Sequence, residues 1–248
     1  SDADGTTNTI TYSLSSNPGN LFAIGSSSGI VTLSQSDSLD YEAATSHTIE
    51  VMATSADTST STQSYTIAVT DVDEFDVTTP TDGNNATNEI DENAVAGTVG
   101  ISASASDADG TTNTITYSLT NDDSGNFVID PGTGVVSTAG SLDHEAGATR
   151  TIEVTATSAD GSFKSDTFTI AVNDVDEFDV SSISDTNSSV ETLAEDASSG
   201  ATVGITALAS DADGTTNTIT YSLSSNPGNL FAIGSSSGIV TLSQSDSL

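Results

Sequence analysis

The sequence SDADGTTNTITYSL occurs three times in the chain, at residues 1–14, 106–119 and 210–223. At the C-terminal end of this motif the apolar residues Ile, Tyr and Leu alternate with Thr and Ser, and this period of two indicates a β-strand with one face in a core. The same alternation occurs at 151–158 and 167–172, in segments rich in the β-branched residues that strands favour. No segment shows a sustained helical period with caps at both ends. The chain is therefore predicted to be all-β.

The spacing of repeated segments gives the size of the structural unit. A second motif, DVDEFDV, occurs at residues 71–77 and 174–180, and residues 1–39 are identical to residues 210–248. The unit is about one hundred residues long, which is the length of one β-sandwich domain and too long for a solenoid repeat. The sequence therefore predicts a tandem array of sandwich domains in which alternate domains are copies of one another.

The repeats predict three domains, of which one is whole. We expect a complete repeat at residues 78–180, a first repeat at 1–77 that lacks its opening strand, and a third at 181–248 that lacks its C-terminal half. A half sandwich exposes a sheet edge and an uncovered apolar face. We therefore expect weak self-association in which the ends of successive molecules meet head to tail.

Charge and composition exclude several classes of function. The 248 residues include 36 Asp plus Glu but only 2 Lys plus Arg, a formal net charge of −34, and no cysteine. A basic surface for nucleic acid is thereby excluded, as are disulfides and thiolate metal sites. The longest apolar runs are only a few residues, so no membrane insertion is predicted. No nucleophile motif is present, and we predict that the chain is not an enzyme.

The carboxylates lie in short clusters at the ends of the predicted strands, while the strand interiors are nearly free of charge. Strand ends of an antiparallel sandwich fall at its two poles, and carboxylates packed together there need a compensating cation. A donor set of oxygens alone suits a hard cation, and the number of ligands favours calcium. The alternative is a solvated halophilic surface, but its charge would spread over strand faces. An EF-hand loop does not fit DADG, which lacks the closing Glu and opens a strand.

The order of five motifs resembles the cadherin repeat. They are ENAVAGT at 92–98, DADG at 107–110, FVIDPGTG at 127–134, LDHE at 142–145 and DVDE at 174–177. The high content of Ser, Thr and Asp, the absence of Cys and the near-identical copies resemble the cadherin-like repeats of giant bacterial adhesins of the RTX type, which are exported by type I secretion. This resemblance implies tandem Ig-like Greek-key β-sandwich domains in an end-to-end rod.

The resemblance also implies a function. It suggests calcium-stiffened extender repeats of an extracellular adhesin on a bacterial cell surface, which hold a distal ligand-binding domain away from the cell. In an alternative, the repeats themselves associate homophilically or bind carbohydrate. That role needs an exposed aromatic or apolar patch, and an aromatic content of 5% argues against glycan binding.

The resemblance implies several calcium ions at each junction between consecutive domains, and it also implies their ligands. At the junction of the first and middle repeats they are Asp40, Glu42, Asp71, Asp73 and Glu74, with Asp107, Asp109 and Asn113 opposite. At the junction of the middle and third repeats they are Glu92, Asp143, Glu145, Asp174, Asp176 and Glu177, with Asp211, Asp213 and Asn217 opposite.

Three departures from the family pattern bear on these sites. The family's linker Asp-x-Asn-Asp-Asn is Asp174-Val175-Asp176-Glu177-Phe178 here, a change that keeps oxygen ligands. The family's Arg in Leu-Asp-Arg-Glu is Tyr41 or His144 here, at a position that is not a ligand. Both His47 and His144 lack a third ligand at metal spacing, and we expect both to be exposed.

The third departure concerns the outermost calcium ion. The late Asp of the family's Ala-x-Asp motif is replaced by Ser55 and Ser158. We expect this ion to be bound more weakly, to shift onto Asp57 or Asp160, or to be lost.

Overall fold

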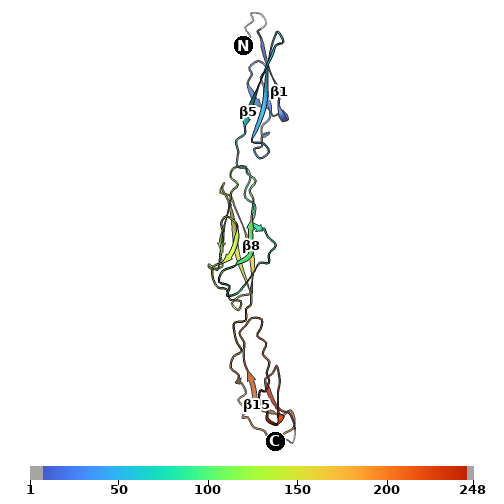
Figure 1. Cartoon of the computed structure of the whole chain (residues 1–248), viewed down its shortest axis with the longest axis vertical. Coiled ribbons are helices and arrows are strands. Elements are labelled where there is room, and N and C mark those ends of the chain that lie inside the picture. The colour runs from blue at the N-terminus through green and yellow to red at the C-terminus, as the bar shows by residue number, and fades with distance from the viewer. Residues whose placement is uncertain (1–7, 245–248) are drawn as a thin grey trace.

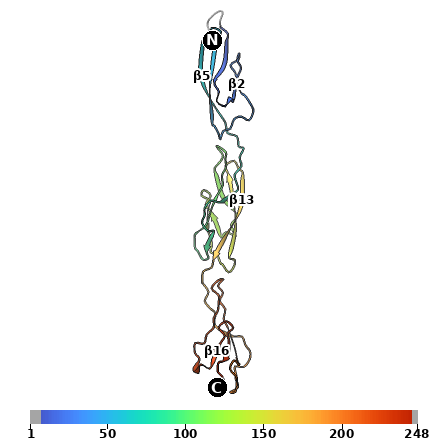
Figure 2. The same ribbon diagram turned by 90° about the vertical axis from the view of Figure 1, so that its right-hand side faces the viewer.

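A computed structural model describes residues 8–244, so that residues 1–7 and 245–248, at the ends of the predicted first and third repeats, lie outside it. The strands form three groups that follow one another along a rod, from the blue N-terminal strands to the red C-terminal strands (Figure 1). A view turned by 90° shows the same end-to-end arrangement (Figure 2). Among the described residues, the helical elements are two single 3-10 turns. The prediction of an all-β chain is therefore confirmed.

The middle group is a complete sandwich of two four-stranded sheets. One sheet has the strand order β10-β11-β8-β6 and the other the order β7-β13-β12-β9. Strand β7 pairs with β13 in parallel, while the other ladders of this group are antiparallel. The strand bounds are β6 (Thr81–Asp82), β7 (Glu89–Asp91), β8 (Thr98–Ser104), β9 (Ile115–Asn121), β10 (Phe127–Ile129), β11 (Val135–Thr138), β12 (Thr149–Ser158) and β13 (Phe163–Asn173).

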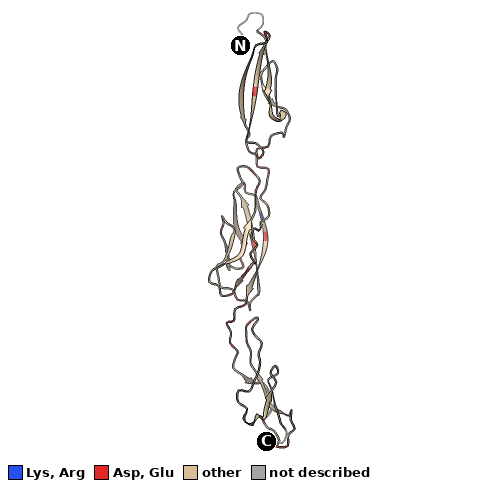
Figure 3. Ribbon diagram, turned by 45° about the vertical axis from the view of Figure 1, so that its right-hand side comes forward, with Lys and Arg blue, Asp and Glu red and all other residues tan. Residues whose placement is uncertain are grey.

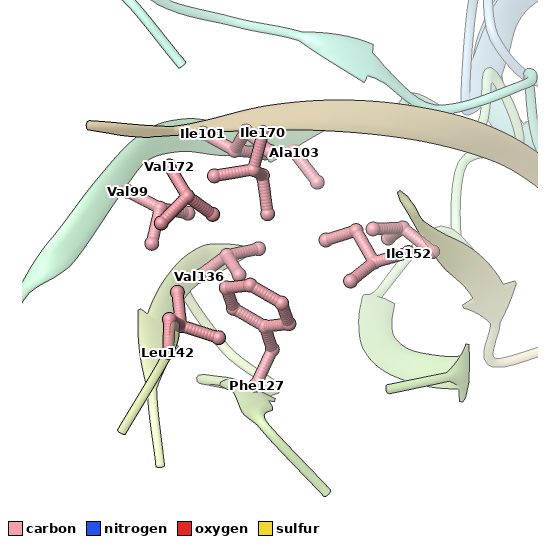
Figure 4. Close-up of a cluster of buried hydrophobic side chains, with 10 residues drawn as sticks. Val99, Ile101, Ala103, Phe127, Val136, Leu142, Ile152, Ile170 and Val172 are labelled. Atoms are coloured by element: carbon pink, nitrogen blue, oxygen red, sulfur yellow. The ribbon is translucent and has the colours of Figure 1, made fainter. Parts of the chain in front are cut away.

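The hydrophobic core lies between these two sheets, as the period-two pattern predicts. Ile152, Val154 and Ala156 alternate along β12 and are 0% exposed. From the opposite sheet, the ring of Phe127 points toward Ile170 of β13 (Figure 4). Full burial of such a side chain stabilises the fold by about 1.5–3 kcal/mol. A core of this kind holds the strand ends, and hence the acidic loops, at fixed places on the two poles.

The first group is an open sandwich. Its elements are β1 (Ile10–Ser16), η1 (Pro18–Asn20), β2 (Phe22–Ile24), β3 (Val31–Leu33), β4 (Ser46–Ser55) and β5 (Thr60–Ala68). The sheet β1-β4-β5 is packed by a two-stranded sheet, β2-β3. Ile49 is 1% exposed and Phe22 is 7% exposed, so the chain still forms a small core here.

The third group consists of one sheet with a cavity on its open face. Its elements are β14 (Ser184–Asp185), β15 (Thr202–Leu208), η2 (Pro227–Asn229), β16 (Phe231–Ile233) and β17 (Ile239–Leu242), and its sheet has the order β14-β15-β17-β16. Phe231 is half-buried and lines a cavity of about 750 Å³ with Leu193, Ile205 and Val240. The domain boundaries 1–77, 78–180 and 181–248 remain predictions, as does the head-to-tail association of the chain ends.

In the described range 8–244, no helix has the length and apolar character that a membrane span requires.

Candidate metal centres between the domains

The acidic residues gather where one group of strands gives way to the next. Two extended segments, 69–80 and 174–183, join the groups, and both carry several carboxylates that Figure 3 marks in red. Loops from the domains on either side approach these linkers. At each junction the DADG loop of the following domain meets the LDYE or LDHE loop of the preceding one.

At the first junction, one cluster lies on the side of the first domain. Oxygen atoms of Glu42, Asp71 and Glu74 lie within 4.8 Å of one another. The Gly110 N–H donates to Glu42 Oε1 at 3.0 Å, and the Thr111 hydroxyl donates to Asp71 Oδ2. The second oxygen of this carboxylate, Asp71 Oδ1, is buried without a hydrogen-bond partner. Hydrogen bonds from the middle domain thus reach this cluster, but one of its carboxylate oxygens is left without a partner.

A second cluster at this junction lies on the side of the middle domain. It brings together oxygen atoms of Asp73, Asp109 and Asp160 within 4.8 Å. Asp109 is 0% exposed, and its Oδ2 atom has no hydrogen-bond partner. The pKa of Asp73 is raised to about 6 by its hydrogen bond with Asp109, then by burial and by the negative charges nearby, Asp160 foremost. A raised carboxyl pKa means that negative charge is disfavoured at this point unless a cation is present.

Asp160 takes part in this cluster although Ser158 stands at the family's ligand position. The Ser158 hydroxyl donates to the carbonyl of Thr112 at 2.8 Å, so it is engaged with backbone. Asp57, the corresponding acid in the first domain, accepts the N–H and the hydroxyl of Ser59 at 2.9 and 2.6 Å. Of the two acids onto which the sequence analysis lets this ion shift, the structure brings Asp160 beside the predicted ligands Asp73 and Asp109.

The second junction has a cluster of four carboxylates whose oxygens lie within 4.8 Å of one another: Glu92, Glu145, Asp174 and Glu177. Glu92 is 2% exposed, and its two oxygens accept the backbone N–H groups of Val175 at 2.8 Å and His144 at 2.6 Å. Burial raises the pKa of Glu177, and the charges of Glu92 and Glu145 act in the same direction. These hydrogen bonds fix a base for the cluster at the end of the middle domain.

Hydrogen bonds across the second junction attach the linker to the third domain. Asp213 is 2% exposed and accepts the backbone N–H of Glu177 at 3.2 Å. The Thr215 N–H donates to Asp174 Oδ2 at 2.8 Å, and the Thr215 hydroxyl donates to the same atom and lowers the pKa of Asp174. The pKa of Asp176 is raised by its hydrogen bond with Asp213 and by the charge of that group.

The remaining predicted ligands lie outside these groups of close oxygens. Asp40 and Asp143 each accept the N–H three residues on, at 3.0 and 2.9 Å, and so close the turns that carry Glu42 and Glu145. Asp40 and Asp143 thus stabilise the conformation of these loops. Asp107 and Asp211 likewise accept the N–H two residues on, and the side-chain amides of Asn113 and Asn217 donate to the carbonyls of Asp109 and Asp213.

The residues at both junctions fit a hard divalent cation. Within residues 8–244, four buried carboxylate oxygens have no hydrogen-bond partner: Asp71 Oδ1, Asp107 Oδ2, Asp109 Oδ2 and Asp174 Oδ1. An unpaired buried carboxylate oxygen is costly, and native proteins satisfy such groups by hydrogen bonds, water or ions. The donors in these clusters are carboxylates, which suit calcium.

The structure corrects the expectation that both histidines are exposed. His47 is half-buried, and its ring meets the ring of Phe22 edge-on, with 6.1 Å between centroids. The side chain of His144 is 17% exposed. Its Nδ1 atom lies near carboxylate oxygens of Glu145 and Asp174, and these three residues form a fourth group of close ligand atoms. Spacing along the sequence could not reveal this group, because Asp174 is supplied by the linker.

Sandwich domains joined end to end, with carboxylates gathered at the junctions, define a class of multidomain adhesion proteins. The cadherin domain family matches residues 1–72 and 87–173, and the chain belongs to this family. Domains of the family are extracellular, are in general non-enzymatic, and generally bind calcium at their junctions. The predicted cadherin-like fold is therefore confirmed.

The relatives are animal cadherins. Human protocadherin Fat 4 is 41% identical over 140 residues, which is 55% of this chain and 3% of that protein, and the mouse protein is 39% identical over the same length. The chain thus spans a small fraction of the length of these relatives. The solved structure of mouse cadherin-23 EC22-24 is 26% identical, with a TM-score of 0.70 over 98% of this chain and 78% of that chain. Cadherin domains 1-5 of protocadherin gamma B2 have a TM-score of 0.74 at 18% identity, over 96% of this chain and 46% of that one, and show the fold alone.

Proposed function

We propose that this chain is a set of spacer repeats in an extracellular adhesin, stiffened by calcium at each junction, which hold a distal binding domain away from the cell. The observation that supports this most directly is the set of buried carboxylate oxygens without partners, two of which belong to linker residues, Asp71 and Asp174. A linker whose carboxylates face both neighbouring domains can be fixed by charge-compensating calcium ions, several at each junction.

The residues of each junction define how such stiffening works. Glu92 holds the start of the linker through Val175 N–H, and Thr215 of the next domain holds Asp174. Calcium supplies positive charge and several further coordination positions for oxygen. Without that charge, the clustered carboxylates repel one another across the linker, and the hydrogen bonds alone must hold the domains in line.

The bacterial origin and type I export belong to this proposal and are supported by sequence character. Residues 1–39 recur unchanged at 210–248, as expected where repeat number and rigidity matter more than individually tuned surfaces. The absence of Cys and the abundance of Ser, Thr and Asp favour the same source.

Homophilic adhesion through the repeats themselves is the alternative, and it is consistent with the family. Exposed apolar side chains in the middle domain, such as Phe163 on β13 at 66% and Val128 on β10 at 51%, lie on strands of opposite sheets. Single exposed apolar residues are ordinary on protein surfaces. The spacer role is therefore the better supported of the two.

Small-angle scattering of the full chain, with calcium and with chelator, tests the proposal. We expect a long rigid particle in calcium and a shorter average maximum dimension after chelation, because the linkers are released while the middle sandwich stays folded. Asp174→Asn should weaken this response, whereas Asp166→Asn, on the exposed part of β13, should not. An unchanged maximum dimension on chelation would contradict the proposal. Sedimentation velocity in calcium would instead favour homophilic adhesion if a concentration-dependent dimer appeared.

A further inference from the structure

The two junctions differ at one position that faces the next domain. Tyr41 occupies it at the first junction and His144 at the second, directly before Glu42 and Glu145. Both rings pack against a glycine of the following DADG loop. A Cβ atom on Gly110 would collide with the ring of Tyr41, and one on Gly214 would collide with Nδ1 and Cε1 of His144. The position therefore has a shared packing role, to which His144 adds a nitrogen atom.

That nitrogen faces two carboxylates. His144 Nδ1 lies 3.4 Å from Glu145 Oε1 and 3.8 Å from Asp174 Oδ1. The three side chains are 17%, 24% and 6% exposed, respectively. Asp174 Oδ1 is the buried oxygen without a hydrogen-bond partner, because Thr215 occupies the other oxygen of this carboxylate. A nine-tenths buried carboxylate thus directs an unsatisfied oxygen to the same point as the imidazole.

We propose that His144 Nδ1, Glu145 Oε1 and Asp174 Oδ1 form a site for a divalent transition metal ion of the Zn²⁺ type. Imidazole nitrogen is a good ligand for zinc, copper and nickel, whereas calcium takes oxygen ligands. Ligands about 2.0–2.2 Å from a tetrahedral zinc ion lie roughly 3.3–3.6 Å from one another. The distances from Nδ1 to the two carboxylate oxygens, 3.4 and 3.8 Å, are already close to that range, and the fourth position is left for water or a neighbouring carboxylate.

The site distinguishes the second junction from the first. The first junction offers Glu42, Asp71 and Glu74 but has the phenol of Tyr41 where the imidazole would be. Zinc and calcium should also compete at the second junction, because Glu145 and Asp174 belong to its carboxylate cluster as well. This competition rests on the calcium-binding function proposed above, whereas the zinc site itself does not.

Zinc titration of the full chain in calcium-free buffer, followed by calorimetry, tests the site against the alternative that the ring of His144 only packs on Gly214. The matched variant is His144→Tyr, which copies the first junction and keeps the ring. We expect the wild type to have one strong site and this variant to lose at least the roughly 10–100-fold in affinity that follows when a residue supporting a metal ligand is removed. Equal zinc binding by both proteins would overturn the proposal.

A reciprocal variant guards against misfolding of the first one. Tyr41→His places an imidazole next to Glu42 at the first junction, and we expect it to add a second strong zinc equivalent. Unchanged stoichiometry in this variant would count against the assigned geometry. Cobalt substitution should give the visible absorption of a tetrahedral ion in the wild type but not in His144→Tyr.

Calcium-dependent melting separates this proposal from the spacer function. His144→Tyr should keep the full calcium response, because the imidazole is not a calcium ligand. If neither the wild type nor the variant responds to calcium while zinc binding still depends on His144, the spacer function fails and the zinc site stands. If both respond to calcium but zinc binding does not depend on His144, the zinc site fails alone.

Discussion

Residues 8–35 and 217–244 contain the same sequence, yet the structure gives them different strands. Residues 10–16 form β1, which pairs with β4 from Ile10 opposite Ser55 to Ser16 opposite Glu50. Residues 219–225 have the same sequence and the same alternation of burial, but none of them is in a strand. The third group has no described counterpart of β4. The alternating pattern therefore determines which side chains of a segment are buried, whereas the presence of a neighbouring strand determines whether the segment forms a β-strand.

The reverse difference occurs at the other end of the same sequence. Val31–Leu33 forms the short β3, paired with β2 alone, and Leu33 is 41% exposed. Its copy, β17, also pairs with β15, and there Leu242 is 1% exposed. Each copy thus forms paired, buried strands at the end where the chain contains a neighbouring strand.

The largest expected effect comes from adding the missing partner. Attaching a copy of residues 40–77 after Leu248, which corresponds to Leu39, should complete the third sandwich and fill its cavity. Residues 219–225 should then become a strand, and each newly buried Ile or Val should add about 1.5–3 kcal/mol of stability. Amide hydrogen exchange at Ser222 would measure this, with Ser13 of β1 in the first copy as internal reference, because the Tyr221 amide already donates to the Ser235 carbonyl. Exchange as fast as in the original chain would show that partner supply does not control the strand.

This comparison also shows what sequence alone can predict. The alternation of apolar and polar residues was sufficient to predict the all-β class and the buried face of β12, because a strand with this pattern buries its apolar face in any β-sandwich. Their sequence could not predict that residues 219–225 are not in a strand, since residues 10–16 have the same sequence and form one. The motif order likewise placed the acidic residues at the junctions. The roles of Asp160 and His144 depended on which loop approaches the linker, and only three-dimensional packing determines that.

A smaller effect is expected from one substitution made in each copy. Leu242→Ala should cost about 2–5 kcal/mol, the usual range for a buried leucine, because it opens a cavity beneath β15. Leu33→Ala should cost within about 0.5 kcal/mol, as for a surface residue. Hydrogen exchange of the amides in β16 and β17, compared with those in β2 and β3, would give the two values separately. Similar losses would mean that the two copies are buried alike in solution.

A third pair of variants tests a single hydrogen bond. The Tyr221 hydroxyl accepts the Ala209 N–H at 3.1 Å, as the Tyr117 hydroxyl accepts the Ala105 N–H at 2.9 Å. Tyr221→Phe leaves a buried backbone donor unpaired and should cost about 1–3 kcal/mol. Tyr12→Phe should change little, because the described part of the first domain contains no counterpart of Ala209. Exchange of the Ala209 amide would report the loss, and an unaffected rate would rule out this contact.

The smallest difference, close to zero, is expected where the two copies agree. Asn17 and Asn226 each bind both backbone groups of the phenylalanine five residues on, with donor–acceptor distances of 2.7 and 3.2 Å in one copy and 2.7 and 3.1 Å in the other. These bonds close a turn made by residues next to one another in sequence, and Gly19 and Gly228 adopt the same positive φ within it, 68° and 71°. Such a turn needs no partner strand, so local sequence alone determines it.

Replacing either asparagine by alanine should therefore cost the same amount, about 0.5–1.5 kcal/mol for each hydrogen bond that is lost. Exchange of the Phe22 and Phe231 amides, whose N–H groups the asparagines accept, provides the measurement. Asn20→Ala, which replaces a residue at a positive φ of 55° that makes none of these bonds, is the control for loosening of the turn in general. Unequal losses between Asn17→Ala and Asn226→Ala would show that the neighbouring strands, which differ between the two copies, affect the stability of this turn as well. The turn would then not be determined by local sequence alone.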